Sequence, residues 1–267
     1  MKYLLITAVT IIACIFISFF SAKVIGKKLR PGIRLLLTAA FAAGLLSAVF
    51  FGYVSIYYHA TDDALGYLQS NDSVQVTKID EGYLFDGVYD DTAIIFYPGG
   101  KVAPEAYAPV MYKLAEKGYD CFLLKMPFNL AILDPDKASD IMLKYGYEKW
   151  YLMGHSLGGN SAAMYAASSP DGIDGLILLA AYPSSKIDDG IRLLSVTGDM
   201  DGCLDMNCYS AALPFCPSDT EFFVIDGGNH SQFGSYGHQF GDKTAAVSRD
   251  DQHQILADKV DSWINAG

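Results

Sequence analysis

The sequence GHSLGG at residues 154–159 decides the fold of this chain. An apolar run, 149–153, precedes it and a stretch of small residues, 157–169, follows it, so we expect a strand, a sharp turn at Ser156 and a helix. Such a turn pushes its serine into a positive-φ conformation. Glycine two positions before and after the serine avoids a collision across the turn. The pattern therefore predicts a serine hydroxyl on a strained turn, beside the N–H groups of a helix.

Two uncharged apolar segments, 3–22 and 35–58, open the chain. At about 1.5 Å per residue each is long enough to cross the roughly 30 Å apolar layer of a membrane, and we expect two transmembrane helices. The segment between them, 23–34, holds five basic residues and no acidic one, which predicts a cytoplasmic loop. The N-terminus and everything after Tyr58 then face the outside of the cell membrane. A rival interpretation makes the first segment a cleaved signal peptide that ends near residue 22, with the second segment as anchor.

Charge changes sign at the same boundary. The first 58 residues carry six basic and no acidic residues, whereas the remainder holds all 30 acidic residues and the other 13 basic ones, a formal charge of −17. The negative electrostatic field of such a domain disfavours nucleic acid and anionic substrates and is compatible with neutral or cationic ones. A well-hydrated surface explains the acidic composition equally. We expect no nucleic-acid partner.

Residues 59–267 have the length of one domain and show no internal repeat. Segments 73–78 and 83–88 predict an antiparallel hairpin. Further apolar strands then alternate with helical patterns, which predicts an α/β fold: a mainly parallel sheet of about eight strands with helices on both faces. Active sites of such sheets lie at the carboxyl ends of strands. The later predicted strands are 92–97, 121–126, 149–153, 175–181, 192–197 and 221–225, and the predicted helices are 104–117, 136–145, 157–169 and 251–265.

A serine hydroxyl needs a base to remove its proton, and the chain has five histidines. His230 follows the last predicted strand through a glycine-rich turn and is the favoured base, with His238 in the next loop as the alternative. The other three histidines are less suited to act as the base. His59 lies at the membrane exit, His155 is inside the serine turn itself, and we expect His253 on the surface of the final helix.

The carboxylate that orients the base is expected at the end of strand 192–197. Asp201 is favoured, because it lies further into the loop beside a glycine, and Asp199 is interpreted as a turn former or a supporting residue. Asp188 and Asp189, after the preceding strand, are weaker candidates. The spacing of Asp199 and Asp201 also fits part of a calcium loop, but further oxygen ligands do not follow.

An oxyanion site requires two backbone N–H donors. The amide of Leu157, at the start of the helix after the serine, is one. The glycine turn YPGGK at 97–101 ends the first parallel strand, so the amide of Gly100 or that of Lys101 is the second candidate. The alternative is an ordinary glycine turn.

The five cysteines predict no cofactor. Cys14 lies in the first apolar segment, and Cys121 opens an apolar run and is expected to be a buried thiol. Cys203, Cys208 and Cys216 lie close together in the sequence, and outside the cell one pair of them forms a candidate disulfide. A zinc site is a weak competing hypothesis, because no histidine stands at ligand spacing. We expect no metal.

The motifs GHSLGG, TGDMDG, DGGNHSQFG and YPGG together resemble those of the α/β-hydrolase superfamily, in particular its compact group of dienelactone-hydrolase-like proteins and small esterases. The resemblance covers about residues 92–267. It implies Ser156 as nucleophile, His230 as general base and Asp201 as its orienting acid, with Leu157 and Gly100 as oxyanion donors. One departure is the Pro-Gly pair at 98–99, where many members have His-Gly.

Only about ten residues separate the strand ending near residue 181 from the one starting near residue 192, so the lid that many lipases insert there is not expected. An open site favours a small or projecting ester, thioester or amide as acyl substrate. The sequence thus predicts a membrane anchor, 1–58, followed by a serine hydrolase domain, 59–267, that works through an acyl-enzyme. The alternatives are an inactive hydrolase fold that serves as a binding module, against which the complete Ser, Asp, His order argues, and an acyltransferase with the same three residues.

Overall fold

The computed structural model describes residues 13–15, 17–18, 30–88 and 91–266. The chain divides into two compact units, Met1–Ile56 and Tyr57–Gly267. The first predicted transmembrane segment, 3–22, and the basic loop, 23–34, lie largely outside the described residues. The two-helix anchor therefore stays a prediction.

The described part of the first unit contains one long apolar helix, α2 (Pro31–Ser55), which matches the second predicted span. Proline at its start is compatible with a first helical turn, and no proline interrupts the alanines, leucines and phenylalanines that follow. Its 25 residues extend about 37 Å, and its mean hydropathy is 2.1 with no buried residue in the most apolar window. By length and composition α2 is able to cross a membrane, properties that it shares with a signal sequence.

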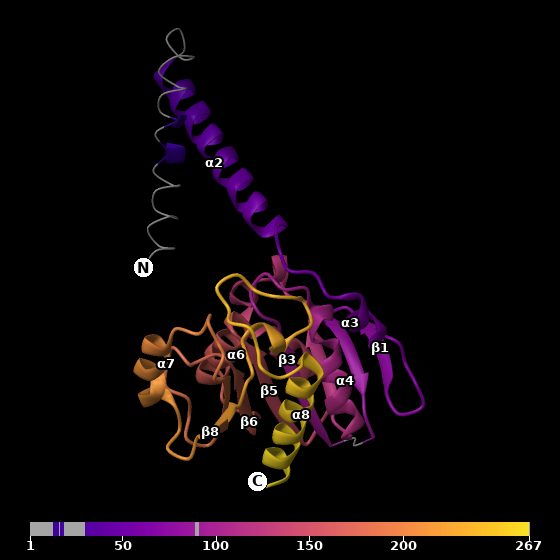
Figure 1. Cartoon of the computed structure of the whole chain (residues 1–267). Coiled ribbons are helices and arrows are strands. Elements are labelled where there is room, and N and C mark those ends of the chain that lie inside the picture. The colour runs from indigo at the N-terminus through magenta and orange to yellow at the C-terminus, as the bar shows by residue number, and fades with distance from the viewer. Residues whose placement is uncertain (1–12, 16, 19–29, 89–90, 267) are drawn as a thin grey trace. The chain divides into compact units, whose positions relative to one another are not determined.

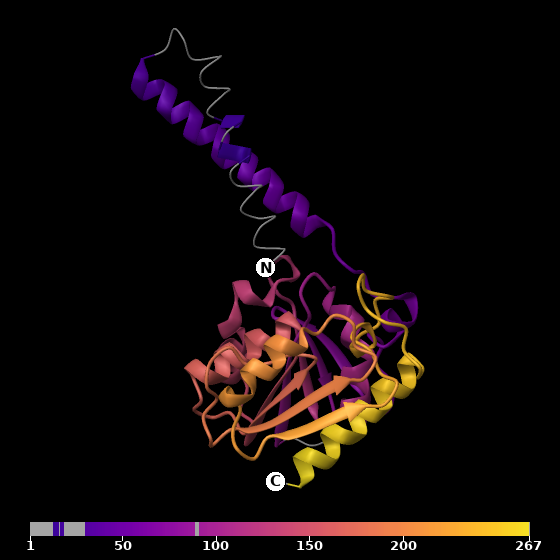
Figure 2. The same ribbon diagram turned by 60° about the vertical axis from the view of Figure 1, so that its left-hand side comes forward.

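The second unit is built on a sheet of eight strands within the described residues, as predicted. Their order is β1-β2-β4-β3-β5-β6-β7-β8, with antiparallel pairing of β1 with β2 and of β2 with β4, and parallel pairing elsewhere. Figures 1 and 2 show this sheet from two sides. The strands are β1 (Gln75–Ile79), β2 (Gly82–Asp86), β3 (Thr92–Tyr97), β4 (Asp120–Leu124), β5 (Lys149–His155), β6 (Gly175–Leu179), β7 (Arg192–Gly198) and β8 (Glu221–Ile225).

Both faces of this sheet are covered, which is why its central strands are apolar throughout. Every residue of β3, β4 and β6 is buried. Alternate side chains enter different cores: Ile94 and Phe96 of β3 pack with one cluster, and Ala93 and Ile95 with the other. The first cluster includes α4 (Ala108–Glu116) and α8 (Arg249–Asn265), and the second includes α5 (Ala138–Lys144) and α6 (Leu157–Ser168).

Several short helices were not predicted. Two are α-helices, α3 (Asp62–Gly66) and α7 (Met206–Ala212), and the Asp205 side chain caps the latter by accepting from two backbone N–H groups. The predicted helix 104–117 begins as a 3-10 turn and becomes α4 at Ala108. The 3-10 helices are η1 (Pro104–Tyr107), η2 (Pro127–Asn129), η3 (Ala131–Leu133), η4 (Pro135–Lys137), η5 (Leu213–Phe215) and η6 (Ser231–Phe233).

The chain enters the second unit beside the loop that follows β3. Tyr58 forms a parallel bridge with Val102: its N–H donates to the Lys101 carbonyl at 2.7 Å, and its carbonyl accepts from Ala103 at 2.8 Å. The Tyr58 hydroxyl also accepts a hydrogen bond from the Phe240 N–H at 3.2 Å. The first residues of this unit are thus joined to two separate loops.

All five cysteines lie within the described residues, and all carry free thiols. The candidate disulfide among Cys203, Cys208 and Cys216 is therefore not formed. Cys121 is fully buried, as predicted, and burial raises the pKa of its thiol well above the usual value.

The prediction that His253 lies on the surface is wrong, since its side chain is only 1% exposed. His253 precedes the buried Leu256, Ala257 and Val260 at helical spacing, so it belongs to the face of α8 that packs against the core. Burial is the main cause that lowers its pKa from 6.5 to about 3, and the positive charges of Arg249 and Lys113 add to the effect. His253 is therefore neutral in the folded protein.

We expect this buried imidazole to make the fold sensitive to acid. Unfolding exposes His253, which then binds a proton below pH 6.5, whereas the folded protein does not until about pH 3. Stability attributable to this residue is complete above pH 6.5 and falls by roughly 1.4 kcal/mol for each pH unit below it. Urea unfolding at pH 7 and pH 5 should therefore show a smaller loss for His253→Gln than for the wild type. His238→Gln, at an exposed position, serves as control and should keep the wild-type loss; an equal loss in all three proteins contradicts this account.

Candidate active site

Ser156 lies on the strained turn between β5 and α6 that the sequence predicts. Its φ of 52° and ψ of −122° place it in a conformation that L-residues rarely adopt. The turn is held by the Ser156 N–H, which donates to the Leu179 carbonyl at 2.9 Å. A Cβ atom at Gly158 would lie 2.2 Å from the Tyr97 carbonyl oxygen, and one at Gly154 would lie 2.7 Å from the backbone of Gly159. Glycine is therefore a steric requirement at both positions.

His230 and Asp201 form a buried hydrogen-bonded pair. Nδ1 of His230 lies 2.8 Å from Oδ2 of Asp201, and both side chains are only 3% exposed. The other oxygen of Asp201 accepts from the N–H groups of Cys203 and Leu204, both at 2.7 Å. Since an ionised carboxylate only accepts hydrogen bonds, the proton of the pair lies on Nδ1 and the lone pair of a neutral His230 lies on Nε2. Nε2 is buried and has no hydrogen-bond partner.

His230 contacts the residue that precedes Ser156, His155. The rings of His155 and His230 pack with centroids 4.5 Å apart, and His155 immediately precedes Ser156. Ser156 and His230 are both among the described residues, and no hydrogen bond joins their side chains. Catalytic hydrogen bonds in unliganded sites are often long and tighten only in the complex with substrate.

The alternative acids and base have other roles. Asp199 is exposed, and its side chain accepts from the Gly227 N–H at 2.6 Å, so it braces the turn after β8. Asp188 accepts from the Gly190 N–H within its own turn, and Asp189 pairs with the exposed Lys186. His238 is exposed.

The glycine turn after β3 lies against the start of α6. A Cβ atom at Gly100 would lie 2.7 Å from Cδ2 and 3.2 Å from Cβ of Leu157, so the two residues with candidate oxyanion amides are neighbours. The Lys101 N–H donates to the Asn129 carbonyl at 2.7 Å. Because that amide is engaged, Gly100 is the better candidate of the two.

A buried tyrosine that the sequence analysis missed supports this glycine turn. The Tyr107 hydroxyl accepts from the Gly99 N–H at 3.1 Å and lies 2.8 Å from Nδ1 of His155. A hydroxyl carries one proton and two lone pairs, so the tautomer of His155 decides whether Tyr107 donates to Nδ1 or accepts from it. Burial, with repulsion from His230, holds the pKa of His155 well below its usual value. The arrangement links the glycine turn to the serine turn, and a polar ring inside the GHSLGG motif was the only sequence signal for it.

Asp242 is the second residue that the sequence analysis missed. Its carboxylate accepts hydrogen bonds from the backbone of Gly202, next to Asp201, and from Ser231, next to His230. The hydroxyl of Ser231 and these backbone N–H groups lower the pKa of Asp242 even though burial opposes them. Asp242 lies in a loop with no helix or strand pattern, so no local signal marked it.

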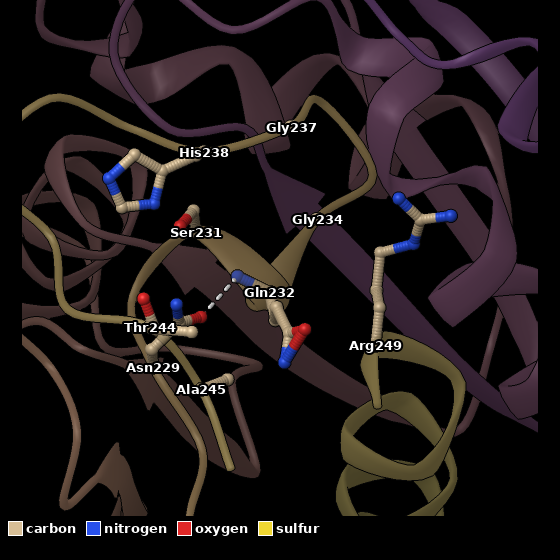
Figure 3. Close-up of a pocket in the computed structure, with 9 residues that line it drawn as sticks. All are labelled: Asn229, Ser231, Gln232, Gly234, Gly237, His238, Thr244, Ala245 and Arg249. Carbon is tan, nitrogen blue, oxygen red and sulfur yellow. Dashed lines mark hydrogen bonds between the residues drawn. The ribbon is translucent and has the colours of Figure 1, made fainter. Parts of the chain in front are cut away.

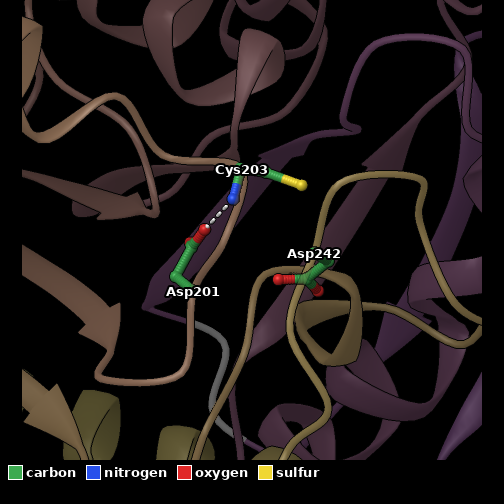
Figure 4. Close-up of side chains that lie close together, drawn as sticks. All are labelled: Asp201, Cys203 and Asp242. Atoms are coloured by element: carbon green, nitrogen blue, oxygen red, sulfur yellow. Dashed lines mark hydrogen bonds between the residues drawn. The ribbon is translucent and has the colours of Figure 1, made fainter.

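Three potential metal ligands lie close together here, as Figure 4 shows. Ligand atoms of Asp201, Cys203 and Asp242 lie within 4.8 Å of one another. Both carboxylates, however, already accept several N–H or O–H donors, and burial with the two neighbouring charges raises the pKa of the Cys203 thiol to about 11. Because the oxygens of both carboxylates are already taken up by these hydrogen bonds, the group is a poor fit to a metal. Cys208 and Cys216, which the zinc hypothesis needs, are not part of this group.

A separate pocket of about 440 Å³ lies beside the histidine loop (Figure 3). The Asn229 side chain accepts from the Gln232 N–H at 3.0 Å and helps to shape it. Ser156, Asp201 and His230 are not in its lining, so it is distinct from the candidate catalytic centre. The lining residues are Asn229, Ser231, Gln232, Gly234, Gly237, His238, Thr244, Ala245 and Arg249.

Comparison with known proteins supports a single family. The model of a family described as alpha/beta hydrolase matches residues 93–254. Among solved structures, a dienelactone hydrolase from Anabaena variabilis is 14% identical with a TM-score of 0.53, covering 73% of this chain and 98% of that one. Naproxen esterase from Bacillus subtilis is 12% identical with a TM-score of 0.53 (76% and 95% covered), and an esterase from M. tuberculosis is 12% identical with a TM-score of 0.54 (80% and 98% covered). At these identities the structures establish the fold alone. No curated protein matches the chain.

Proposed function

The chain belongs to the α/β hydrolase family, and we propose that it is a serine hydrolase that cleaves a carboxylic ester or a related acyl bond. The observation that carries this proposal is the buried pair of His230 and Asp201 beside the strained turn of Ser156. A histidine whose Nδ1–H is held by a carboxylate presents a basic Nε2, which is the group that a serine nucleophile requires.

The proposed reaction has two halves. Oγ of Ser156 attacks the acyl carbon as Nε2 of His230 takes its proton, and Asp201 stabilises the imidazolium that forms. The amides of Leu157 and Gly100 bind the oxyanion, and His230 then gives its proton to the departing alcohol, leaving an acyl-enzyme. Water repeats the sequence: His230 takes a proton from it, the hydroxide attacks the acyl carbon, and the Ser156 oxygen leaves with the proton.

An accessible site favours a small or projecting acyl substrate. Residues 180–191, which join β6 to β7, are all described and contain no helix or strand, so no lid domain is inserted at this position. The strongly acidic composition after residue 58 is compatible with neutral or cationic substrates. Short acyl esters and lactones, the latter in view of the dienelactone hydrolase of similar fold, are the first compounds to screen.

Acyl transfer to an acceptor other than water uses the same residues, and analysis of products with candidate acceptors separates it from hydrolysis. A binding module on an inactive hydrolase fold is the other alternative. The intact hydrogen bond between His230 and Asp201 favours an enzyme, because a binding module has no need of it.

We further propose that the enzyme is anchored in the cell membrane by two helices, α2 being the second, with the hydrolase domain outside. The apolar length of α2 and the basic segment before it support this topology.

A fluorophosphonate probe tests the nucleophile. It should label Ser156 of the full-length protein, because the probe reacts with an activated serine hydroxyl. Ser156→Ala should abolish the label, whereas Ser168→Ala, at the other end of α6, should keep it. Mass spectrometry of the labelled peptide identifies the site. A folded wild-type protein that takes up no probe would refute the proposed function.

Two asparagine variants test the acid. Asp201→Asn offers His230 an amide instead of a carboxylate and should lower kcat by about 10⁴-fold, the loss found when the triad aspartate of a serine protease is changed in this way. Asp199→Asn changes only an exposed side chain, and its amide oxygen can still accept from the Gly227 N–H, so the rate should stay within a few-fold of the wild type. Hydrolysis of a short acyl ester, measured on both variants, decides between them, and the reverse order of effects assigns the acid to Asp199.

Reporter fusions test the topology. Alkaline phosphatase fused after Tyr58 should be active, because it folds only outside the cytoplasm, and the same enzyme fused after Lys28 should be inactive. An N-terminal tag that remains on the mature protein supports two helices, and its loss supports a cleaved signal peptide. Activity only in the Lys28 fusion overturns the proposed orientation.

A further inference from the structure

One carboxylate joins the two loops that carry the candidate acid and the candidate base. Asp242 contributes no atom to the contact between Asp201 and His230, yet it is bonded to the chain neighbours of both. We propose that Asp242 is a positioning residue that holds Asp201 and His230 at hydrogen-bonding distance. This inference rests on the proposed function of that pair.

The hydrogen bonds divide between the two oxygens of Asp242. Oδ1 accepts from the N–H of Gly202 at 2.9 Å and from its own neighbour Lys243 at 3.0 Å, with a longer contact of 3.4 Å to the N–H of His230. Oδ2 accepts from the N–H of Ser231 at 2.8 Å and from its hydroxyl at 2.5 Å. The carboxylate therefore bridges the loop after β7 and the loop after β8.

Nearer the sheet these loops are joined by the Met200 N–H, which donates to the Gly228 carbonyl at 2.9 Å, and by the Asp199 side chain, which accepts from the Gly227 N–H. Asp242 adds a bridge further along each loop, beside Asp201 and His230. Asp201 and His230 lie beyond the last paired residues of β7 and β8, Gly198 and Ile225, so the ladder of the sheet does not extend to them. A displacement of about 1 Å in such a pair is enough to cost roughly 10²-fold in rate. A third loop that contacts both can set the distance.

The backbone around Asp242 is packed closely enough to act as a spacer. A Cβ atom at Gly202 would lie 2.5 Å from the Gly241 carbonyl oxygen and 3.0 Å from the carbonyl carbon of Asp242. The Phe240 N–H donates to the Tyr58 hydroxyl, so the same loop is fastened at a second point. Glycine at position 202 is what allows the two loops to approach.

Asp242 acts on the backbone and not on the imidazole ring. Its partners are N–H groups and the Ser231 hydroxyl, whereas the Nδ1–H of His230 is bonded to Asp201. Charge-assisted hydrogen bonds of this kind are about twice as strong as neutral ones. In an Asp242→Asn variant an NH₂ group, which only donates, replaces one of the two acceptor oxygens. The side chain then loses its acceptor for either Gly202 or Ser231.

The rate of fluorophosphonate labelling of Ser156 in the full-length protein tests this inference without a known substrate. We expect Asp242→Asn to lower the second-order rate constant by 10-fold to 100-fold while the final labelled fraction stays complete. Asp205→Asn is the matched control: it removes a carboxylate that accepts two backbone N–H groups in the same segment but has no contact with Ser231 or His230, and its rate should equal that of the wild type. A rate for Asp242→Asn within twofold of the wild type overturns the proposal.

A double-mutant cycle separates positioning from general destabilisation. If Asp242 acts through the Asp201 and His230 pair, Asp242→Asn should have almost no effect in an Asp201→Asn background. An equal fold-loss in both backgrounds is the result of a merely structural role and contradicts the inference. Should Asp242→Asn not fold, Ser231→Ala, which removes a single donor, replaces it in the same cycle and should slow labelling several-fold.

The proton NMR signal of the His230 Nδ1–H gives a readout that does not depend on catalysis. It should shift upfield and broaden in Asp242→Asn and stay unchanged in Asp205→Asn. If the wild type is not labelled, the proposed function fails while this signal still decides whether Asp242 holds the pair. An unchanged signal in Asp242→Asn rejects the positioning role.

Discussion

The strained backbone at Ser156 is the constraint on which the site depends. A residue with φ of 52° and ψ of −122° persists only if its surroundings leave it no alternative, and here β5 is paired on both sides, by β3 and by β6. The close approach of Gly158 to the Tyr97 carbonyl joins the turn to the end of β3 as well. The rigid centre of the sheet thus holds a conformation that a loop alone would lose.

The polar groups around this turn show how a buried site is satisfied. Asp201 accepts three donors, and the Tyr107 hydroxyl is hydrogen-bonded both to the Gly99 N–H and to Nδ1 of His155. Leaving any of these buried groups unpaired would cost about 1–3 kcal/mol of folding free energy, which explains why each of them has a hydrogen-bond partner. Nε2 of His230, by contrast, is buried without a hydrogen-bond partner.

Much of this arrangement could be predicted from sequence because its signals are local. Apolar runs identified the strands, and GHSLGG identified the turn, since steric demands act on adjacent residues. The chain order then favoured His230 and Asp201, which the structure joins. Tyr107 and Asp242 act through tertiary contacts, of Tyr107 with His155 and of Asp242 with Gly202, and such contacts leave no local pattern. The burial of His253 was missed for a different reason: a polar residue was assigned to the surface although its spacing to Leu256 and Val260 matched the buried face.

The bridge between Tyr58 and Val102 joins the first residues of the second unit to the loop after β3, which also holds the candidate oxyanion amide of Gly100. Two residues separate the end of α2 at Ser55 from Tyr58. The backbone of Tyr58 is hydrogen-bonded to Lys101 and Ala103, in the loop that follows Gly100. A protease that cut between Ser55 and Tyr57 would release a domain with this brace intact. A cut after Thr61 would remove the brace, so a second unit separated from α2 must retain Tyr58 to keep it.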